Sequence, residues 1–171
     1  SDFENLKKIY KSQLNVGIGF DVHKLVPKRK LYLAGLKIKS PVGTLGHSDG
    51  DPVLHSITDA ILGACKMGDI GQMFSDKSKK FKNVRSTILL ERVIKQTKLA
   101  GYFINNMDIN IITQTPKIQK YKKKMIENIS KICEISKKQI NIKGKTTEKL
   151  GVIGKEKAVA CEVIVSIVKY D

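Results

Sequence analysis

Hydrophobic positions along the chain follow two different spacings, and the change from one to the other divides the chain into helices and strands. Apolar residues three and four positions apart predict helices over residues 52–67, 85–100 and 116–133. Apolar residues at alternate positions or in short runs predict strands over 16–22, 31–39 as a hairpin, 102–112, 139–145 and 157–169. This order mixes the two types without a repeat, which predicts an α/β (α+β) fold with a single mixed sheet packed against helices.

The same spacings predict the core and the domain limits. In the second helix, the residues expected to face inward are Ile88, Leu89, Val93 and Leu99. In the third helix, which Pro116 is expected to open, they are Ile118, Tyr121, Met125, Ile129 and Ile132. Residues 16–171 are expected to form one domain after a polar N-terminal extension over residues 1–15, and residues 77–83 are expected to form a mobile loop.

The first helix has a clear start signal. Asp51 can accept hydrogen bonds as its cap, and Pro52 suits the first helical position. The apolar stripe on this helix consists of Val53, Leu54, Ile57, Ile61 and Ala64. His55 lies off the main line of that stripe, and Asp59 follows one turn later.

The first strand supplies possible partners for His55. Its alternation directs Asp21 and His23 to one face and Phe20 and Val22 to the other. One carboxylate and two imidazoles form a ligand set that zinc accepts, with a fourth position open to water or substrate, as in catalytic sites. The alternative is structural: His23 ends an edge strand, and His55 is an ordinary hydrogen-bonded helix residue.

Charge is the most unusual feature of the composition. The 171 residues include 32 Lys and Arg against 16 Asp and Glu, a net charge of +16, which predicts attraction to phosphate groups. The only arginines are Arg29, Arg85 and Arg92, and no aromatic residues interleave with the lysine runs. The runs are therefore expected to be solvated surface, and nucleic-acid binding is not expected.

The cysteines and the apolar runs exclude further classes. Cys65, Cys133 and Cys161 are far apart and lie in apolar contexts, which predicts small buried side chains in a reducing compartment. No run approaches the roughly 18 apolar residues of a membrane span, so no membrane partner is expected.

Four motifs carry a family resemblance. They are GFDVHKL at 19–25, GHSDGDPVLHSITDAILGACKMGDIGQMFSD at 46–76, TQTPK at 113–117 and KTTEKLG at 145–151. In this order, across residues 16–170, the chain resembles the 2-C-methyl-D-erythritol 2,4-cyclodiphosphate synthases of the non-mevalonate isoprenoid pathway. The resemblance implies a lyase: the 2-phosphate of 4-diphosphocytidyl-2-C-methyl-D-erythritol 2-phosphate attacks the β-phosphorus, and CMP leaves.

The resemblance also implies the residue roles. Zn²⁺ would be held by Asp21, His23 and His55, and a second cation, Mg²⁺ or Mn²⁺, with the help of Glu148. His47 and Thr146 would be catalytic donors to the phosphates, together with Ser48, and Asp59 would orient a metal ligand.

Three segments would bind the substrate: 69–71 the methylerythritol hydroxyls, 74–78 as a flexible cover, and 113–119 the cytidine. The full substrate-binding set is Asp21, Val22, His23, His47, Ser48, Asp69, Ile70, Gly71, Phe74, Ser75, Asp76, Lys77, Ser78, Thr113, Gln114, Thr115, Pro116, Lys117, Ile118, Gln119, Lys145, Thr146, Thr147, Glu148, Val152 and Lys155. Thr146 to Glu148 could instead cap a helix or turn. Lys145 and Lys155 depart from the usual family pattern, which puts one cytidine or phosphate contact, and an isoprenoid diphosphate on the trimer axis, in doubt.

Assembly and location are further expectations. The family is a homotrimer with active sites shared between subunits, and the apolar final strand fits a sheet that covers helices on one face and faces the threefold axis on the other. The abundance of Lys, Ile and Asn and the non-Met start suggest an apicoplast-type plastid stroma, with a bacterial cytoplasm as the alternative. Two other functions stay open: a zinc-dependent phosphohydrolase of a nucleotide-linked substrate, and a basic nucleic-acid-binding module.

Overall fold

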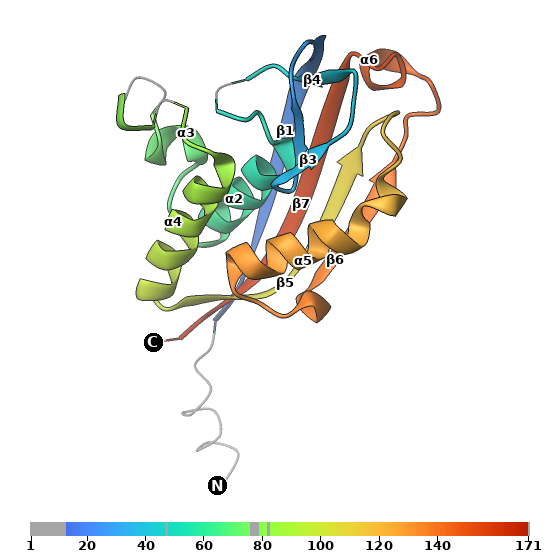
Figure 1. Cartoon of the computed structure of the whole chain (residues 1–171). Coiled ribbons are helices and arrows are strands. Elements are labelled where there is room, and N and C mark those ends of the chain that lie inside the picture. The colour runs from blue at the N-terminus through green and yellow to red at the C-terminus, as the bar shows by residue number, and fades with distance from the viewer. Residues whose placement is uncertain (1–12, 47, 76–78, 82, 171) are drawn as a thin grey trace, which may run out of the picture.

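A five-stranded mixed sheet forms the centre of the computed structural model, which describes residues 13–46, 48–75, 79–81 and 83–170 (Figure 1). The strand order is β4-β1-β7-β5-β6, and every neighbouring pair is antiparallel except β5 and β6. The strands are β1 (Gln13–Pro27), β4 (Val42–Thr44), β5 (Tyr102–Ile112), β6 (Ile140–Lys145) and β7 (Ala158–Lys169). A separate hairpin, β2 (Leu31–Leu33) with β3 (Leu36–Ile38), lies beside the sheet.

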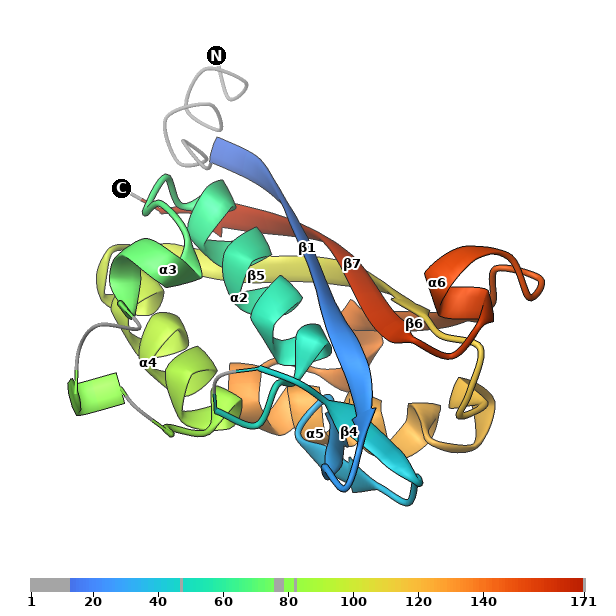
Figure 2. The same ribbon diagram turned by 90° about the horizontal axis from the view of Figure 1, so that it is seen from above.

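The longer helices all cover the same face of the sheet, as the view from above shows (Figure 2). They are α2 (Pro52–Ala64), which packs on β1 and β7, α4 (Ser86–Leu99), which packs on α2, and α5 (Lys122–Cys133), which packs on α4 and β6. Short helices are α3 (Ile70–Met73), α6 (Gly151–Gly154) and the 3₁₀ turns η1 (Lys79–Phe81), η2 (Ile118–Lys120) and η3 (Lys137–Gln139). No helix of the described chain is both long and apolar enough to span a bilayer.

The predicted order of elements is confirmed, but two element starts are wrong. The first strand begins at Gln13 and runs to Pro27, because β7 pairs with it from Gln13 to Lys24 and β4 extends the pairing. Residues 13–15, predicted to belong to the N-terminal extension, are therefore part of the sheet. Pro116 does not open the third helix, which begins at Lys122 after the 3₁₀ turn η2, where Ile118 packs on Gly144 of β6.

Two further predictions about the helices are wrong in detail. Ile88 and Leu99 are 42% and 81% exposed and lie off the buried face of α4. That face carries the predicted Leu89 and Val93, and also Leu90 and Ile94. Helix α2 ends at Ala64 and not at residue 67: the chain leaves the helix through Cys65, and Lys66 takes a left-handed conformation with φ of 58°. The strand β4 and the helices α3 and α6 were not predicted.

The start of α2 is as predicted. The Asp51 carboxylate accepts from the backbone N–H groups of Val53 and Leu54 at 3.0 and 3.1 Å, and the apolar stripe of the helix is buried. The same carboxylate accepts from Ala34 and Gly35 in the β2–β3 turn, which the sequence did not indicate. One side chain thus joins the hairpin to the start of the helix.

The opposite face of the sheet has no covering layer within the described chain. Its β1 residues are Leu14, Val16, Ile18, Phe20 and Val22, each between 49% and 65% exposed. Ile164 of β7 is 51% exposed on the same sheet. An apolar strip thus runs along β1 on the side away from the helices.

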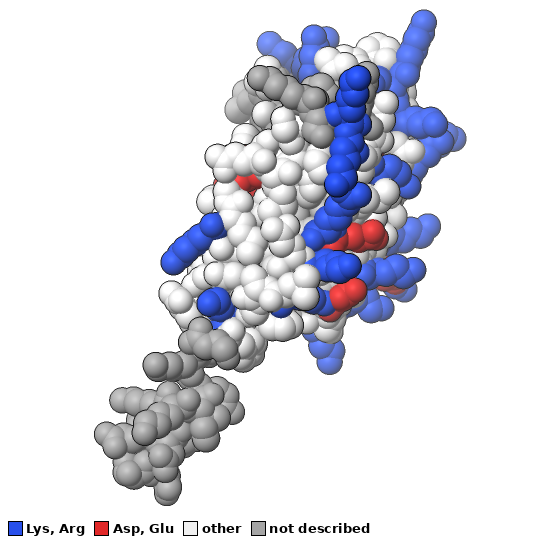
Figure 3. Space-filling view, turned by 90° about the vertical axis from the view of Figure 1, so that its left-hand side faces the viewer, with Lys and Arg blue, Asp and Glu red and all other residues white. Residues whose placement is uncertain are grey.

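In the lysine-rich runs at 28–30, 77–82 and 122–124, the lysines that the structure describes are exposed or half-buried, as predicted. Most Lys and Arg side chains visible in Figure 3 gather towards one edge of that view, next to a broad uncharged area.

The three cysteines are buried and unpaired, and burial raises the pKa of the Cys65 and Cys133 thiols to about 12. At neutral pH these thiols stay protonated, which fits the predicted role as small apolar side chains.

Candidate active site

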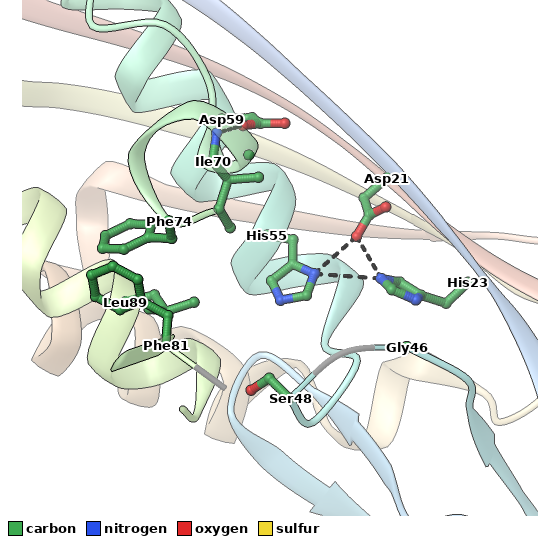
Figure 4. Close-up of a pocket in the computed structure, with 11 residues that line it drawn as sticks. Asp21, His23, Gly46, Ser48, His55, Asp59, Ile70, Phe74, Phe81 and Leu89 are labelled. Atoms are coloured by element: carbon green, nitrogen blue, oxygen red, sulfur yellow. Dashed lines mark hydrogen bonds and ion pairs between the residues drawn. The ribbon is translucent and has the colours of Figure 1, made fainter. Parts of the chain in front are cut away.

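Three side chains from two elements converge beside the helical layer, as predicted. Asp21 and His23 lie on the face of β1 that packs against α2, and His55 lies in the first turns of α2 (Figure 4). Asp21 Oδ2 is 2.8 Å from His23 Nε2 and 3.1 Å from His55 Nδ1, and the two nitrogens are 3.4 Å apart. Among the described residues, this is the one group of three or more His, Cys, Asp or Glu side chains with convergent ligand atoms.

A backbone contact fixes the ring of His23. Its Nδ1 atom is 2.9 Å from the carbonyl oxygen of Leu45. A carbonyl only accepts, so Nδ1 carries a hydrogen, and Nε2 is the ring atom that faces Asp21 and His55. Gly46 makes room for this ring, since a Cβ there would lie 2.7 Å from it.

The charge state of the cluster follows from these contacts. Burial would raise the pKa of Asp21, but the hydrogen bonds and charges of His23 and His55 outweigh burial and hold the pKa at about 2. Burial lowers the pKa of His23, and the bonds to Asp21 and to the Leu45 carbonyl more than offset this, so the pKa is raised. Asp21 is therefore ionised at neutral pH and able to bind a cation.

The donor set fits a zinc ion. Tetrahedral zinc with bonds of about 2.0–2.1 Å holds its ligand atoms about 3.3 Å apart. The three separations of 2.8, 3.1 and 3.4 Å are close to this value. One carboxylate and two imidazoles are the nitrogen and oxygen ligands that zinc accepts, and three protein ligands leave a fourth position open.

The cluster opens into a cavity of about 260 Å³ between β1, α2 and α4. The lining residues are Asp21, His23, Gly46, Ser48, His55, Asp59, Ile70, Gly71, Phe74, Phe81 and Leu89. One wall is polar and carries Asp21, His23 and His55. The other is apolar and carries Phe74, Phe81 and Leu89 (Figure 4). A ligand with a charged end and a carbon skeleton matches this division.

Eight of the predicted site residues meet in this cavity: Asp21, His23, Ser48, His55, Asp59, Ile70, Gly71 and Phe74. Val22 points to the uncovered face of the sheet and is 49% exposed. Asp69 accepts from the Gln72 N–H at 2.8 Å and caps α3, and Ser75 does not line the cavity. The predictions for His47, Asp76, Lys77 and Ser78 lie outside the described residues.

Asp59 has a different contact from the predicted one. Its carboxylate accepts from the backbone N–H of Ile70 at 2.8 Å and so holds the start of α3 against α2. Burial raises the pKa of this carboxyl. A role for Asp59 in orienting a metal ligand stays a prediction.

A second cavity, of about 290 Å³, lies at the ends of β5 and β6. Its lining residues are Thr113, Gln114, Pro116, Lys117, Ile118, Gln119, Lys122, Gly144, Lys145 and Thr146. Residues of the segment predicted to hold the cytidine, 113–119, therefore share one concave surface with Lys145 and Thr146, which belong to a later predicted substrate-binding segment. Lys122 and Gly144 were not predicted; both adjoin predicted segments, in the first turn of α5 and at the end of β6.

The hydroxyls of Thr146 and Thr147 stabilise the turn at residues 146–150, as the alternative interpretation predicts for a turn, but neither caps a helix. Thr147 Oγ1 donates to the Leu150 carbonyl at 2.7 Å, and Glu148 N donates to Thr146 Oγ1 at 3.3 Å. Helix α6 begins without a side-chain cap. The Thr146 and Glu148 side chains are exposed or half-buried, which leaves them accessible to a ligand.

Four other predicted substrate residues lie near this turn but outside both cavities. Thr115 Oγ1 donates to Glu156 Oε1 at 3.1 Å, and Thr147 makes the turn contact described above. Val152 is 62% exposed on α6, and Lys155 follows it at the surface. Their contact with substrate stays a prediction.

The two cavities belong to different edges of the sheet. The metal cluster is on β1, and the second cavity is on β5 and β6, with β7 between β1 and β5. At a strand spacing of about 4.8 Å, β1 and β6 are about 14 Å apart. Glu148 is not part of the ligand cluster that Asp21 forms within one chain.

Comparison with known proteins assigns the family. A family model, described as the YgbB family, matches residues 14–168, which is most of the chain. This chain belongs to the YgbB family. Its relatives include a 2-C-methyl-D-erythritol 2,4-cyclodiphosphate synthase of Clostridium botulinum, 48% identical, with 91% of this chain and 99% of the relative aligned. The family resemblance drawn from the four motifs is confirmed.

Some relatives of this YgbB member are longer. A bifunctional enzyme IspD/IspF of Pelagibacter ubique is 73% identical over 95% of this chain, and the aligned part is 44% of that enzyme. The chain thus spans less than half of this relative and nearly all of the Clostridium one. A solved structure of Plasmodium falciparum IspF in complex with CDP has 40% identity and a TM-score of 0.82, with 92% of this chain and 97% of that chain covered.

Residues around the cluster include some that the sequence did not indicate. Phe81 and Leu89 line the cavity. Ser86 contacts His55 directly, and Asp49 is linked to His55 through Ser86. Ser86 is 31 residues from His55 and carries no motif of its own. Only the packing of α4 on α2 brings it to the ring.

Proposed function

We propose that the chain converts 4-diphosphocytidyl-2-C-methyl-D-erythritol 2-phosphate to the 2,4-cyclodiphosphate with release of CMP, the activity of the YgbB-family synthases. The observation that supports it best is the convergence of Asp21, His23 and His55 at the mouth of a half-apolar cavity. The second cavity, built from the segments expected to hold cytidine, supports the nucleotide part of the substrate.

The reaction needs positioning and charge stabilisation more than a protein nucleophile. An oxygen of the 2-phosphate attacks the β-phosphorus, the bond from that phosphorus to the CMP oxygen breaks, and CMP carries away the electron pair. A zinc ion held by Asp21, His23 and His55 would polarise phosphate oxygens. His47 and Thr146 would donate hydrogen bonds as negative charge builds up. Ser48, which lines the cavity, would join them by turning its hydroxyl from the Val84 carbonyl to the substrate.

The apolar wall of the first cavity suits the rest of the substrate. Ile70 and Phe74 would contact the methylerythritol carbons, and the backbone of residues 69–71 would bind its hydroxyls. In the second cavity, Thr113 to Gln119 would hold the cytidine, and Lys145 the phosphates. Glu148 would help hold the second cation, Mg²⁺ or Mn²⁺, between the two parts.

We further infer that the working form is a homotrimer. Within one chain, Asp21 and His23 lie on β1, and the second cavity lies at the ends of β5 and β6. Three strand spacings, about 14 Å, separate β1 from β6. A threefold arrangement with the uncovered strip of β1 towards the axis would cover Phe20 and its apolar neighbours. It would also place the second cavity of one subunit beside the metal cluster of the next.

The relatives named above by sequence come from bacteria, and they give the apicoplast prediction no support. We therefore place the chain in a bacterium, in agreement with the second of the two locations considered. The reducing compartment expected from the free cysteines suits a bacterial cytoplasm.

Turnover followed by phosphorus NMR tests the function. With zinc and Mg²⁺ present, the cytidylyl substrate should give CMP and a cyclic diphosphate. Removing both metals should abolish turnover, and adding them back should restore it. Inorganic phosphate as the product would favour a phosphohydrolase. No turnover, together with nucleic-acid affinity that falls steeply with salt and is unaffected by His55→Ala, would favour the basic binding module.

A further inference from the structure

The outer nitrogen of His55 contacts a buried serine. His55 Nε2 is 2.8 Å from Ser86 Oγ, at the first residue of α4. The Ser86 hydroxyl donates a short hydrogen bond to Asp49 Oδ1, and the Ser86 backbone N–H donates to Asp49 Oδ2 at 3.1 Å. A continuous chain of hydrogen bonds therefore runs from the Asp49 carboxylate through Ser86 to His55.

The hydrogen bonds from His55 through Ser86 to Asp49 all point in one direction. An ionised carboxylate only accepts, so the one hydrogen of the Ser86 hydroxyl goes to Asp49. The hydroxyl oxygen is then left to accept, and the hydrogen between Ser86 and His55 belongs to Nε2. His55 Nδ1 consequently has a lone pair free for a metal ion held between Asp21, His23 and His55, which is what a metal ligand needs.

The surroundings keep the arrangement stable. Ser86 is 1% exposed, and the Asp49 side chain is 6% exposed, so water competes little for either group. Asp49 is held by the Ser86 N–H and by Arg85, whose Nε lies 3.9 Å from Oδ2. The adjacent Ser48 hydroxyl donates a short bond to the Val84 carbonyl, which fastens the loop of residues 48–50 to the start of α4 a second time.

We propose that Asp49 and Ser86 are positioning residues for the metal site: together they hold His55 in the Nε2–H tautomer, so that Nδ1 is free to bind the ion. This inference rests on the proposed zinc site. It assigns to Ser86 and Asp49 the ligand-orienting role that the sequence suggested for Asp59, whose carboxylate contacts the Ile70 N–H instead. Without the serine, the Nε2–H group loses its acceptor, and Asp21 Oδ2, 3.1 Å from Nδ1, draws the hydrogen to the ligand nitrogen.

The test is Ser86→Ala, with zinc affinity measured by competition with a chromophoric chelator. Loss of an outer partner of a metal-bound histidine typically lowers affinity roughly ten- to hundred-fold, and we expect a loss in this range. The matched control is Ser56→Ala, the same change at a buried serine that follows His55 in the sequence. The Ser56 hydroxyl donates to the Cys161 carbonyl at 3.0 Å and not to the His55 ring. This control should keep the affinity of the unaltered chain.

Ring nitrogen NMR separates positioning from a purely structural effect. The chain has three histidines, which makes the ¹⁵N signals assignable. In the zinc-free chain at alkaline pH, His55 should be the Nε2–H tautomer, and in Ser86→Ala it should shift towards Nδ1–H. Should Ser86→Ala fail to fold, Asp49→Asn provides the same test, because an amide both donates and accepts and no longer imposes a direction on the serine.

Each outcome has a defined meaning. Weaker zinc binding together with the tautomer shift supports the proposal. Unchanged affinity, or weaker binding with His55 still in the Nε2–H form, overturns it while leaving the zinc site intact. Failure of the unaltered chain to bind one zinc per subunit would instead remove the proposed metal site itself.

Discussion

At the scale of single residues, side chains with two or more partners connect parts of the fold that the sequence keeps apart. Asp51 caps α2 and holds the β2–β3 turn, and it is wholly buried. Oδ1 accepts from three N–H groups, and Oδ2 accepts from Gly35 N at 2.6 Å. A carboxylate is suited to this position because both of its oxygens accept.

Asp51→Asn should therefore destabilise the protein. The amide keeps one accepting oxygen but places an N–H group against the Gly35 N–H, which leaves a buried donor without an acceptor. We expect the free energy of unfolding to fall by about 1–3 kcal/mol, measured by urea unfolding. Asp108→Asn is the control: this carboxylate, 42% exposed in its side chain, pairs with Lys143 at the surface, and its loss should cost at most about 1 kcal/mol. An equal loss of unfolding free energy in the two variants would show that Asp51 does not join the hairpin to the helix start as described.

His55→Ala tests the metal ligands at the same scale. Removing one of three ligands should abolish stoichiometric zinc binding, while the fold is kept because the His55 ring is not part of the buried core. The zinc content per subunit is measured after dialysis, and circular dichroism shows whether the variant is folded. A normal zinc content would show that the cluster is not the metal site.

At the scale of elements, the site depends on the close approach of β1 to α2. A Cβ at Gly19 would lie 1.9 Å from the carbonyl oxygen of Ser56, and one at Gly17 would lie 1.9 Å from that of Ala60. The strand backbone thus rests directly on the helix backbone, which brings Asp21 and His23 within reach of His55. These glycines are needed for this close packing.

Gly19→Ala should be strongly destabilising. The added methyl group meets backbone and cannot be relieved by a rotamer change, so the loss should reach or exceed the upper end of overpacking costs, about 3 kcal/mol. Gly63→Ala is the control, since a Cβ there meets nothing within 4 Å and the residue is exposed on α2. That variant should be neutral or more stable by up to about 1 kcal/mol. Thermal unfolding of both variants gives the comparison, and a mild effect of Gly19→Ala would show that β1 can move away from α2 at little cost.

At the scale of the whole molecule, the two cavities and the uncovered strip of β1 become parts of one problem. Each chain has a metal cluster at one edge of the sheet and a predicted nucleotide cavity towards the other. Its uncovered face is apolar along β1. The proposed homotrimer would resolve both features, because each contact in a closed threefold ring joins different surfaces of neighbouring subunits.

Subunit mixing tests this arrangement. His55→Ala and Thr146→Ala alter opposite halves of the proposed shared site, so each should be inactive alone. Unfolded and reassembled together in equal amounts, they should regain activity, since random mixing leaves about a quarter of the sites with both halves intact. Mass measurement in solution should give a trimer and confirm exchange. Activity no greater than the sum of the separate variants, despite exchange, would show that each site lies within one chain.

The sequence by itself determined the order and type of the main elements, the face of β1 that carries Asp21 and His23, and the start of α2. These features are local: a period of two or 3.6 residues decides which side chains share a face, and Asp51 with Pro52 marks a helix start whatever lies around it. The motifs determined the family for a related reason, since the residues to which the family resemblance assigns phosphate and metal binding lie in short continuous segments.

Only the tertiary structure decided where β1 begins, which residues of α4 face inward, and what holds His55. Gln13 joins the sheet because Lys169 pairs with it, Ile88 is exposed because α2 contacts another face of its helix, and Ser86 reaches His55 because α4 packs on α2. In each case the deciding partner is distant in sequence. Local spacing does not record contacts between segments that only the completed fold brings together.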